Sequence, residues 1–175
     1  MIPAMTEILT TDRLRLRLVT EDDAPFYLAL ANDPAFIEHI GDRQLRTVDA
    51  ARSGLREGPI AMQEKHGHSL YLVERLADGA PIGLSGLVKR DTLEHVDIGY
   101  AFLPDYRGCG YAFEAGQAVV RLAARMGIRR LAAIVSPGNA ASIALLRRLG
   151  LRLERRACLA PGQPEVDVYL ADLEG

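Results

Sequence analysis

The chain has 175 residues, enough for one sizeable hydrophobic core and too few for two ordinary domains, so we expect a single domain spanning residues 1–175. Hydrophobic residues make up 49% of the sequence and charged residues 25%, as in ordinary soluble globular proteins. The 21 basic and 23 acidic side chains give a formal net charge of −2. This balance does not favour nucleic acid as a general partner.

Cysteine content and the N-terminal segment narrow the class of protein further. The only two cysteines, Cys109 and Cys158, form no CxxC motif, which argues against a disulfide framework and a structural zinc site. We therefore expect no metal. Residues 1–11 lack the basic and apolar regions of a secretory signal, and no apolar run approaches the length of a membrane span. These features predict a cytoplasmic protein with no membrane partner.

The first part of the chain predicts one strand followed by helices. Arginine and leucine alternate over residues 13–18, a period of two that predicts a strand with one buried face and one cationic face. Thr20 and the acidic residues 21–23 resemble a capping box and predict the start of a helix that ends before Pro34. Further helices are predicted at residues 35–40 and from residue 47 to 65, the latter interrupted at Gly58 and Pro59.

The second part predicts a hairpin, further strands and two helices. Residues 70–73, 81–89 and 95–103 are predicted to be antiparallel neighbours. Gly83 and Gly86 either weaken the second of these strands or indicate a close approach by another backbone. A helix over 112–126 precedes a short apolar strand, 131–135, of the kind buried in a parallel crossover. A helix over 140–149 and a hairpin of residues 151–158 and 166–170 follow. This order predicts an α/β protein with a mixed sheet flanked by helices.

The segment from Asp105 to Ala112 joins a predicted strand to the longest predicted helix. Gly108 and Gly110 carry no Cβ, so backbone amides at the helix N-terminus can close on a bulky anion such as a diphosphate, and Arg107 can add a full charge. The loop lacks the third glycine of a dinucleotide fingerprint and the Gly-Lys-Ser/Thr ending of a phosphate loop. On its own, it fits an ordinary tight turn equally well.

Two separated motifs resemble one family. Arg107-x-x-Gly110-x-Ala112 resembles the pyrophosphate loop of the GNAT superfamily of acyl-CoA N-acyltransferases. Asn139-x-x-Ser142, followed by the leucines at 145 and 146 and by residues 149–151, is similar to the second signature of that family. The opening residues 11–17 and the closing residues 162–167 resemble the RimJ/RimL-type branch, which acetylates the N-termini of ribosomal proteins. The resemblance therefore spans nearly the whole chain.

This resemblance implies a fold, a co-substrate and a set of binding residues. The implied sheet is mostly antiparallel, with a central parallel pair of strands that splay apart. The implied co-substrate is acetyl-CoA, with Asn139 bonded to its pantetheine arm and Ser142 beside its thiol end. Because Asn139 directly precedes Ala140, capping of the following helix is an alternative role for it, and the two roles are compatible. The strand edge implied to pair with the arm, like an added strand, comprises Ala101, Phe102 and Leu103. The loop implied to hold the diphosphate comprises Arg107, Gly108, Cys109, Gly110, Tyr111 and Ala112.

The implied activity is transfer of the acetyl group to a primary amine. The acceptor is either a protein N-terminal α-amine, as the branch resemblance favours, or a small molecule such as a polyamine, an antibiotic or an amino acid. A CoA-binding module without turnover and a nucleotide-binding regulator remain alternatives. The implied partners are acetyl-CoA and the acceptor, and the chain is expected to be a monomer or a homodimer.

Acid and base chemistry is the least determined part of the site. Asp97 is the first candidate for a general base, followed by His95 and Glu94, although a carboxylate on a solvated strand face is an equally good interpretation of Asp97. Alternation along the strand places Asp97 on the face opposite Ile98 and Tyr100, and a bulge in this strand would move it to the other face. Many family members carry a tyrosine, which protonates the departing thiolate, at the position of Leu146. Here Ser142 or Tyr111 serves instead, or CoA leaves as the thiolate, whose reference pKa is about 8.5.

Overall fold

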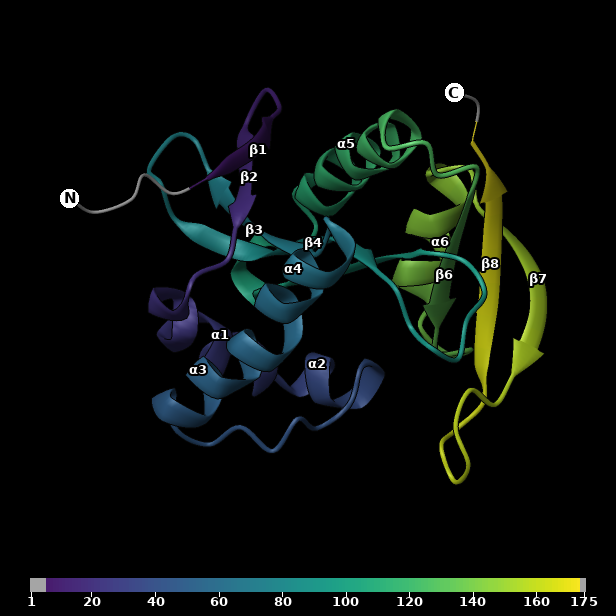
Figure 1. The fold of residues 1–175 in the computed structure, drawn as a ribbon, viewed down its shortest axis with the longest axis horizontal. Coiled ribbons are helices and arrows are strands. Elements are labelled where there is room, and N and C mark those ends of the chain that lie inside the picture. The colour runs from purple at the N-terminus through teal and green to yellow at the C-terminus, as the bar shows by residue number, and fades with distance from the viewer. Residues whose placement is uncertain (1–5, 174–175) are drawn as a thin grey trace.

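The computed structural model describes residues 6–173, which form one eight-stranded sheet with helices on both faces (Figure 1). The sheet order is β1-β2-β3-β4-β5-β6-β8-β7. The strands are β1 (Glu7–Thr10), β2 (Leu14–Leu18), β3 (Leu70–Arg75), β4 (Pro81–Val88), β5 (Asp97–Phe102), β6 (Arg130–Val135), β7 (Arg152–Ala157) and β8 (Val166–Asp172). The α-helices are α1 (Ala24–Ala31), α2 (Pro34–His39), α3 (Val48–Leu55), α4 (Ala61–His66), α5 (Tyr111–Arg125) and α6 (Ala140–Arg148). Within the described range, no helix combines the length and apolar character needed to cross a membrane.

Two hydrophobic clusters cover the two faces of the sheet. The larger one packs α5 and α6 against the sheet through side chains such as Val119 and Leu146, and includes Ile98 and Phe102 of β5. The smaller one packs α1, α2 and α3 against the other face, where Leu72 and Leu84 point. Because side chains alternate along a strand, β5 contributes to both clusters.

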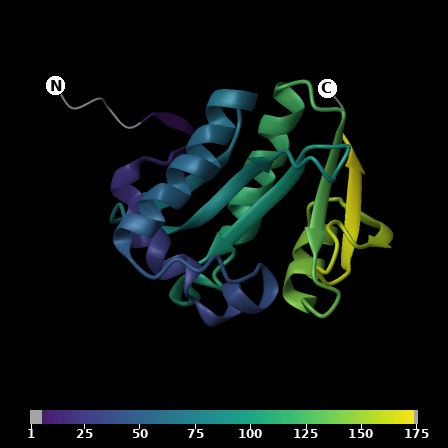
Figure 2. The same ribbon diagram turned by 60° about the horizontal axis from the view of Figure 1, so that its bottom comes forward.

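The centre of the sheet contains its one parallel pair among the described strands. β5 and β6 are in register only where Asp97 lies opposite Ala132, and Ala132 N–H donates to Val96 C=O at 2.9 Å. Beyond this point the two strands have no further paired residues. Figure 2 shows the teal strands β4 and β5 running at an angle to the green β6 and the yellow β8. The predicted mixed sheet, mostly antiparallel with a central splayed parallel pair, is confirmed.

The predicted close approach at Gly83 and Gly86 is also confirmed. A Cβ at Gly83 would lie 2.5 Å from the carbonyl oxygen of Ala101, and one at Gly86 would lie 2.1 Å from that of Ser69. Both distances are far below van der Waals contact, so only glycine allows β4 to pack against its neighbours here. β1 was not predicted, because the segment 7–10 is short and lacks clear alternation.

The predicted interruption at Gly58 and Pro59 is not a break. A π-helical turn, η2 (Arg56–Ile60), joins α3 to α4. Proline cannot donate to the preceding turn and its ring crowds the helix backbone. The wider π turn provides a way to carry the chain past the ring, which is buried. The sequence therefore predicted an irregularity at the proline correctly, but not that the chain stays helical through it.

The predicted cationic face of β2 is wrong at Arg17. Its side chain is only 6% exposed and is bonded through two nitrogens to the carboxylate of Asp23, at 2.8 and 2.9 Å. Its Nε lies 3.3 Å from Glu74 of β3. Asp23 also accepts from the backbone N–H of Thr20 at 2.8 Å, as a capping box requires. Arg17 therefore ties the start of α1 to the sheet instead of facing solvent.

Arg17→Ala is expected to lower the free energy of unfolding by about 3–5 kcal/mol, since it leaves the buried carboxylate of Asp23 without its cation and removes one of the two arginines that pair with Glu74. Arg15→Ala is the matched control, because Arg15 lies on the same strand and also pairs with Glu74, but its side chain is 39% exposed. We expect it to cost less than about 1 kcal/mol. Urea unfolding of both variants measures the difference, and equal losses would contradict a special role for Arg17.

Candidate active site

The loop between β5 and α5 has the backbone conformation that its glycines predict. Gly108 and Gly110 have φ angles of +72° and +84°, in the left-handed region that side chains disfavour. Backbone pairing of α5 begins with Glu114 N–H, which donates to Gly110 C=O at 3.1 Å. The N–H groups of the first helical residues, Tyr111 and Ala112 among them, have no acceptor within the helix and give this end partial positive charge.

Arg13, at the start of β2, holds this loop in place. Its Nη1 donates to the carbonyl oxygen of Cys109 at 3.1 Å, and its Nε donates to Glu114 at 2.7 Å. The guanidinium carbon lies 4.4 Å from the centre of the Tyr111 ring. Glu114 also accepts from the hydroxyl of Thr11, so it joins the β1–β2 hairpin to the first turn of α5. Sequence reasoning missed this role, because the alternation of arginine and leucine predicts a cationic face but not the residues that this face contacts.

The Arg107 guanidinium is turned away from the loop amides. Its Nε donates to the carbonyl oxygen of Phe102 at 3.0 Å, and its Nη2 is paired with Asp33, the residue that caps α2. Arg107 therefore braces the end of β5 against the first helices. Cys109 is exposed, and its thiol lies 3.6 Å from the carbonyl oxygen of Arg107.

The edge of β5 that faces β6 is open beyond the single paired position. Leu103 N–H donates to Ile82 of β4 at 2.9 Å, whereas Val96 C=O accepts from β6. Because backbone groups alternate in direction along a strand, those of Tyr100 and Phe102 point toward β6. Those of Ala101 and Leu103 point toward β4. The open edge thus offers the N–H and C=O of Tyr100 and the N–H of Phe102, whose carbonyl oxygen already accepts from Arg107.

The N-terminus of α6 lies across this opening. Asn139 caps the helix, with its Oδ1 accepting from the N–H of Ser142 at 3.2 Å. Its Nδ2 makes no hydrogen bond to any residue of the described range, so the amide can cap the helix and still donate to a ligand. The Ser142 hydroxyl is hydrogen-bonded to the phenol of Tyr100. Sequence reasoning missed this contact, because it assigned no role to the side chain of Tyr100.

Asp97 is fully buried at the start of β5, which excludes the interpretation as a solvated carboxylate. Its Oδ2 accepts from Arg90 Nε at 3.0 Å, whereas its buried Oδ1 has no hydrogen-bond partner among residues 6–173. Burial raises the pKa of Asp97 to about 6, although the Arg90 guanidinium acts in the opposite direction. The β4–β5 register contains no bulge, so Asp97 faces the side of the sheet opposite Ile98.

The other two candidate bases precede β5 in a loop. The Nε2 of His95 lies 3.8 Å from the exposed carboxylate of Glu94, and neither residue is buried. Neither side chain therefore has the enclosed environment that raises the pKa of Asp97. Across residues 6–173, no three histidine, cysteine, aspartate or glutamate side chains gather as a metal site would require.

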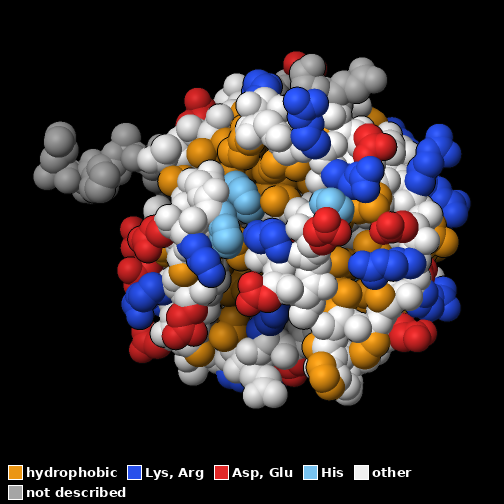
Figure 3. Space-filling view, turned by 45° about the vertical axis from the view of Figure 1, so that its right-hand side comes forward, with side chains coloured by type: hydrophobic (Ala, Val, Ile, Leu, Met, Phe, Trp, Pro, Cys, Tyr) orange, Lys and Arg blue, Asp and Glu red, His pale blue; other side chains and the backbone are white. Residues whose placement is uncertain are grey.

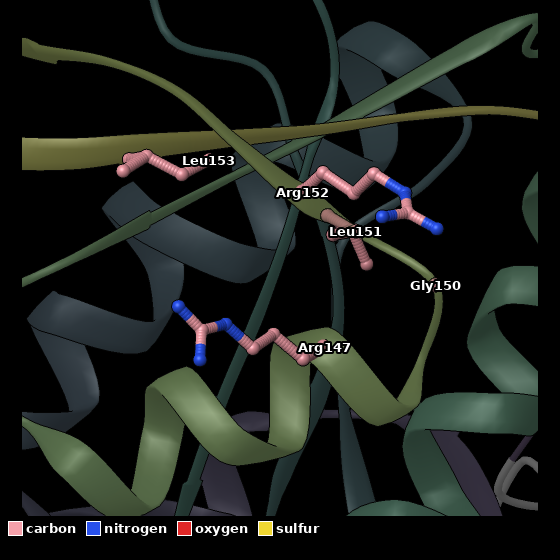
Figure 4. A pocket seen from close by; sticks show the side chains of 5 residues that line it. All are labelled: Arg147, Gly150, Leu151, Arg152 and Leu153. Carbon is pink, nitrogen blue, oxygen red and sulfur yellow. The ribbon is translucent and has the colours of Figure 1, made fainter.

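Two hollows lie beside the helices α5 and α6. One of about 610 Å³ borders the loop and is lined by Arg13, Gly110, Glu114 and Arg121 among others. The other, of about 420 Å³, lies between the end of α6 and the start of β7 (Figure 4). There Arg147 and Arg152 project from the helix and the strand, with Leu153 nearby. The first hollow adjoins the candidate active site, and the second adjoins the opposite end of α6 from Asn139.

A loop of free amides that leads onto an open strand edge suits a long carrier with a diphosphate at one end, as acyl-CoA-dependent transferases use. A family model described as "Acetyltransferase (GNAT) domain" matches residues 13–152. The chain belongs to this family and is an acetyl-CoA-dependent N-acetyltransferase.

Three known proteins illustrate the similarity. The chain is 30% identical over 152 residues to the uncharacterized N-acetyltransferase YoaA of Bacillus subtilis (strain 168), covering 86% of this chain and 85% of YoaA. An acetyltransferase structure from Agrobacterium tumefaciens str. C58 has a TM-score of 0.80 at 26% identity, covering 99% and 98% of the two chains. A Salmonella typhimurium acetyltransferase that modifies the N-terminal serine of 50S ribosomal protein L7/L12 has a TM-score of 0.79 at 22% identity, covering 96% and 99%.

Proposed function

We propose that this N-acetyltransferase acts on the α-amine at the N-terminus of a protein, with Asp97 as the general base. The observation that carries the proposal is the burial of Asp97, which raises the pKa of its carboxyl group to about 6. An α-ammonium group has a reference pKa of about 8, against about 10.4 for lysine. A base of this strength is matched to the first and too weak for the second. At neutral pH, about a tenth of α-amines are already neutral, against less than about a thousandth of lysines.

In this proposal acetyl-CoA supplies the acetyl group as a thioester and leaves as CoA. The amides from Gly108 to Ala112 hold the diphosphate, with the N-terminal end of α5 and Arg13 supplying positive charge. The open edge at Tyr100 and Phe102 pairs with the amides of the pantetheine arm. Asn139 donates from its Nδ2 to the same arm. Arg107 supports this site by fixing the end of β5 and does not supply a charge to the diphosphate.

Gly110→Val is expected to weaken acetyl-CoA binding at least about tenfold, since a side chain in this left-handed position displaces the loop amides from charge-assisted hydrogen bonds. Gly127→Val is the matched control, because Gly127 has the same φ of +84° but lies beyond the other end of α5. Both variants should lose similar stability in thermal unfolding. Calorimetric titration with acetyl-CoA separates them, and unchanged affinity in folded Gly110→Val would refute the proposed loop contacts.

The chemistry of transfer is divided between the two faces of β5. Asp97 lies on the face covered by α1–α3, where it accepts the amine proton through an intervening water. Ser142 and the phenol of Tyr100 lie on the face covered by α5 and α6. Backbone N–H groups of the open edge between them are directed at the carbonyl oxygen that gains charge during attack. In this arrangement the amine and the leaving sulfur approach the open edge from different sides.

One structural neighbour acts on a protein N-terminus. The Salmonella acetyltransferase is described as modifying the N-terminal serine of a ribosomal protein. The face in Figure 3 intermingles acidic and basic side chains around hydrophobic areas and histidines, without a field of one sign. Such a surface favours neither strongly acidic nor strongly basic acceptors.

A panel of acceptors tests the α-amine assignment. We expect acetylation of peptides with a free N-terminus, and no acetylation of the same peptides when the N-terminus is blocked and only a lysine side chain remains. Release of free CoA thiol, with mass spectrometry of the peptides, measures both. Small amines such as polyamines and amino acids are run in parallel. Turnover of those amines alone would contradict a protein acceptor while leaving the transferase activity intact.

With an acceptor in hand, Asp97→Asn is expected to lower kcat by about 10²–10⁴-fold with little change in the KM for acetyl-CoA. Asp97 must be ionised to accept a proton, so wild-type activity should rise as the pH increases through about 6. In the variant this rise in the pH profile should vanish, so that only the pH dependence set by ionisation of the acceptor amine remains. Glu94→Gln, which removes an exposed carboxylate nearby, is the control. A loss below about threefold in Asp97→Asn would exclude it as the base.

A further inference from the structure

The side chain of Tyr100 makes a contact that the proposed binding and base roles leave unexplained. It starts from β5 and reaches across the opening to α6, where its phenol bonds to the hydroxyl of Ser142. The same phenol lies 3.5 Å from the carbonyl oxygen of Ser142. No other side-chain hydrogen bond within the described range joins β5 to α6. The pair therefore bridges the gap beside the open edge of β5.

The direction of this hydrogen bond follows from the acidity of the two groups. A phenol has a reference pKa of about 10 and is a better donor than an aliphatic hydroxyl. Tyr100 O–H therefore donates to Ser142 Oγ, and the hydrogen of Ser142 is free to point elsewhere. Burial raises the pKa of Tyr100 further, although its bond to Ser142 acts in the opposite direction. The phenol thus stays protonated, and able to donate, at neutral pH.

We propose that Tyr100 is a positioning residue for the departing thiol, which holds and polarises Ser142 so that the serine hydroxyl donates to the sulfur of CoA. As the carbon–sulfur bond breaks, its electron pair passes to sulfur, and the hydrogen bond from Ser142 stabilises the charge. Hydrogen bonds in series strengthen one another, so the bond from Tyr100 makes Ser142 a stronger donor. The inference rests on the proposed acetyl-CoA site but on no particular acceptor.

The other residues considered as donors to the departing thiol lie elsewhere. Leu146, at the position where a tyrosine is common in the family, is 1% exposed and packed in the core beneath α6. Tyr111, the other tyrosine near the loop, packs against Arg13 on the side of β2. A phenol is therefore present at the thiol end, but it comes from β5 and acts through a serine of α6.

The test measures the pKa of the CoA thiol in its complex with the protein, so that it needs no acceptor. The thiolate absorbs in the near ultraviolet, and titration of the complex gives the pKa directly. In the wild type we expect this pKa to lie below that of free CoA. Tyr100→Phe should raise it by about half a unit, and Ser142→Ala by about one unit, the effect of one hydrogen bond to a charged group.

A double variant and a hydroxyl deletion elsewhere complete the design. Because Tyr100 acts through Ser142, the double variant should titrate like Ser142→Ala alone. Tyr27→Phe, which removes the phenol of a partly buried tyrosine packed against the other hydrophobic cluster, should titrate like the wild type. The inference would be overturned if Tyr100→Phe binds CoA and the thiol of the bound CoA keeps its wild-type pKa. It would also be overturned if the effects of the two substitutions on that pKa add fully in the double variant. Failure of the wild type to bind CoA would refute the acetyl-CoA site itself and, with it, this inference.

Discussion

The restriction of β5–β6 pairing to one position is the constraint on which the rest of the structure depends. Backbone N–H and C=O groups must find partners, and a strand in the middle of a sheet normally finds them on both sides. Here β5 pairs fully with β4 but loses β6 after Asp97. The groups beyond that point need water or a ligand. An extended chain with amides of its own, such as pantetheine, meets that need without any rearrangement of the sheet.

The opening has to be held at a fixed width, and distant parts of the chain do this. Arg107 fastens the end of β5 to Asp33 at the start of α2. Arg13 fastens the following loop to β2, about a hundred residues away in sequence. In this way the N-terminal third of the chain supports a site to which its only proposed direct contribution is the charge of Arg13. Substitutions in β2 should therefore change the position of the loop between β5 and α5.

Motifs whose chemistry is local could be predicted from the sequence. The glycine loop and the Asn139 cap each depend on a few neighbouring residues, and the structure has both. The mostly antiparallel sheet and its central splayed pair followed from the family resemblance. Partners brought together by tertiary folding could not be predicted. The contacts of Arg13, Arg107 and Tyr100 join residues 5 to 101 positions apart along the chain, and no pattern in the sequence specifies them.

Asp97 shows what the alternation of residues along a strand can and cannot predict. The period of two identified its face correctly, because β4 and β5 pair without a bulge. It could not tell a solvated face from one covered by helices and loops, since burial depends on elements elsewhere in the chain. The unusual pKa of this carboxyl group is therefore a tertiary property, although the residue itself was an obvious candidate.

The sheet ends at β7, whose first five residues are exposed on both faces. An outer strand leaves its backbone donors and acceptors available to any other extended chain, and a flat apolar one would invite stacking into larger sheets. β7 carries three arginines and one glutamate among its six residues. Two such strands laid edge to edge would bring an excess of positive charge together. Repulsion at this margin should favour separate molecules over fibrous assembly at high concentration, while the open edge inside the sheet stays available to its ligand.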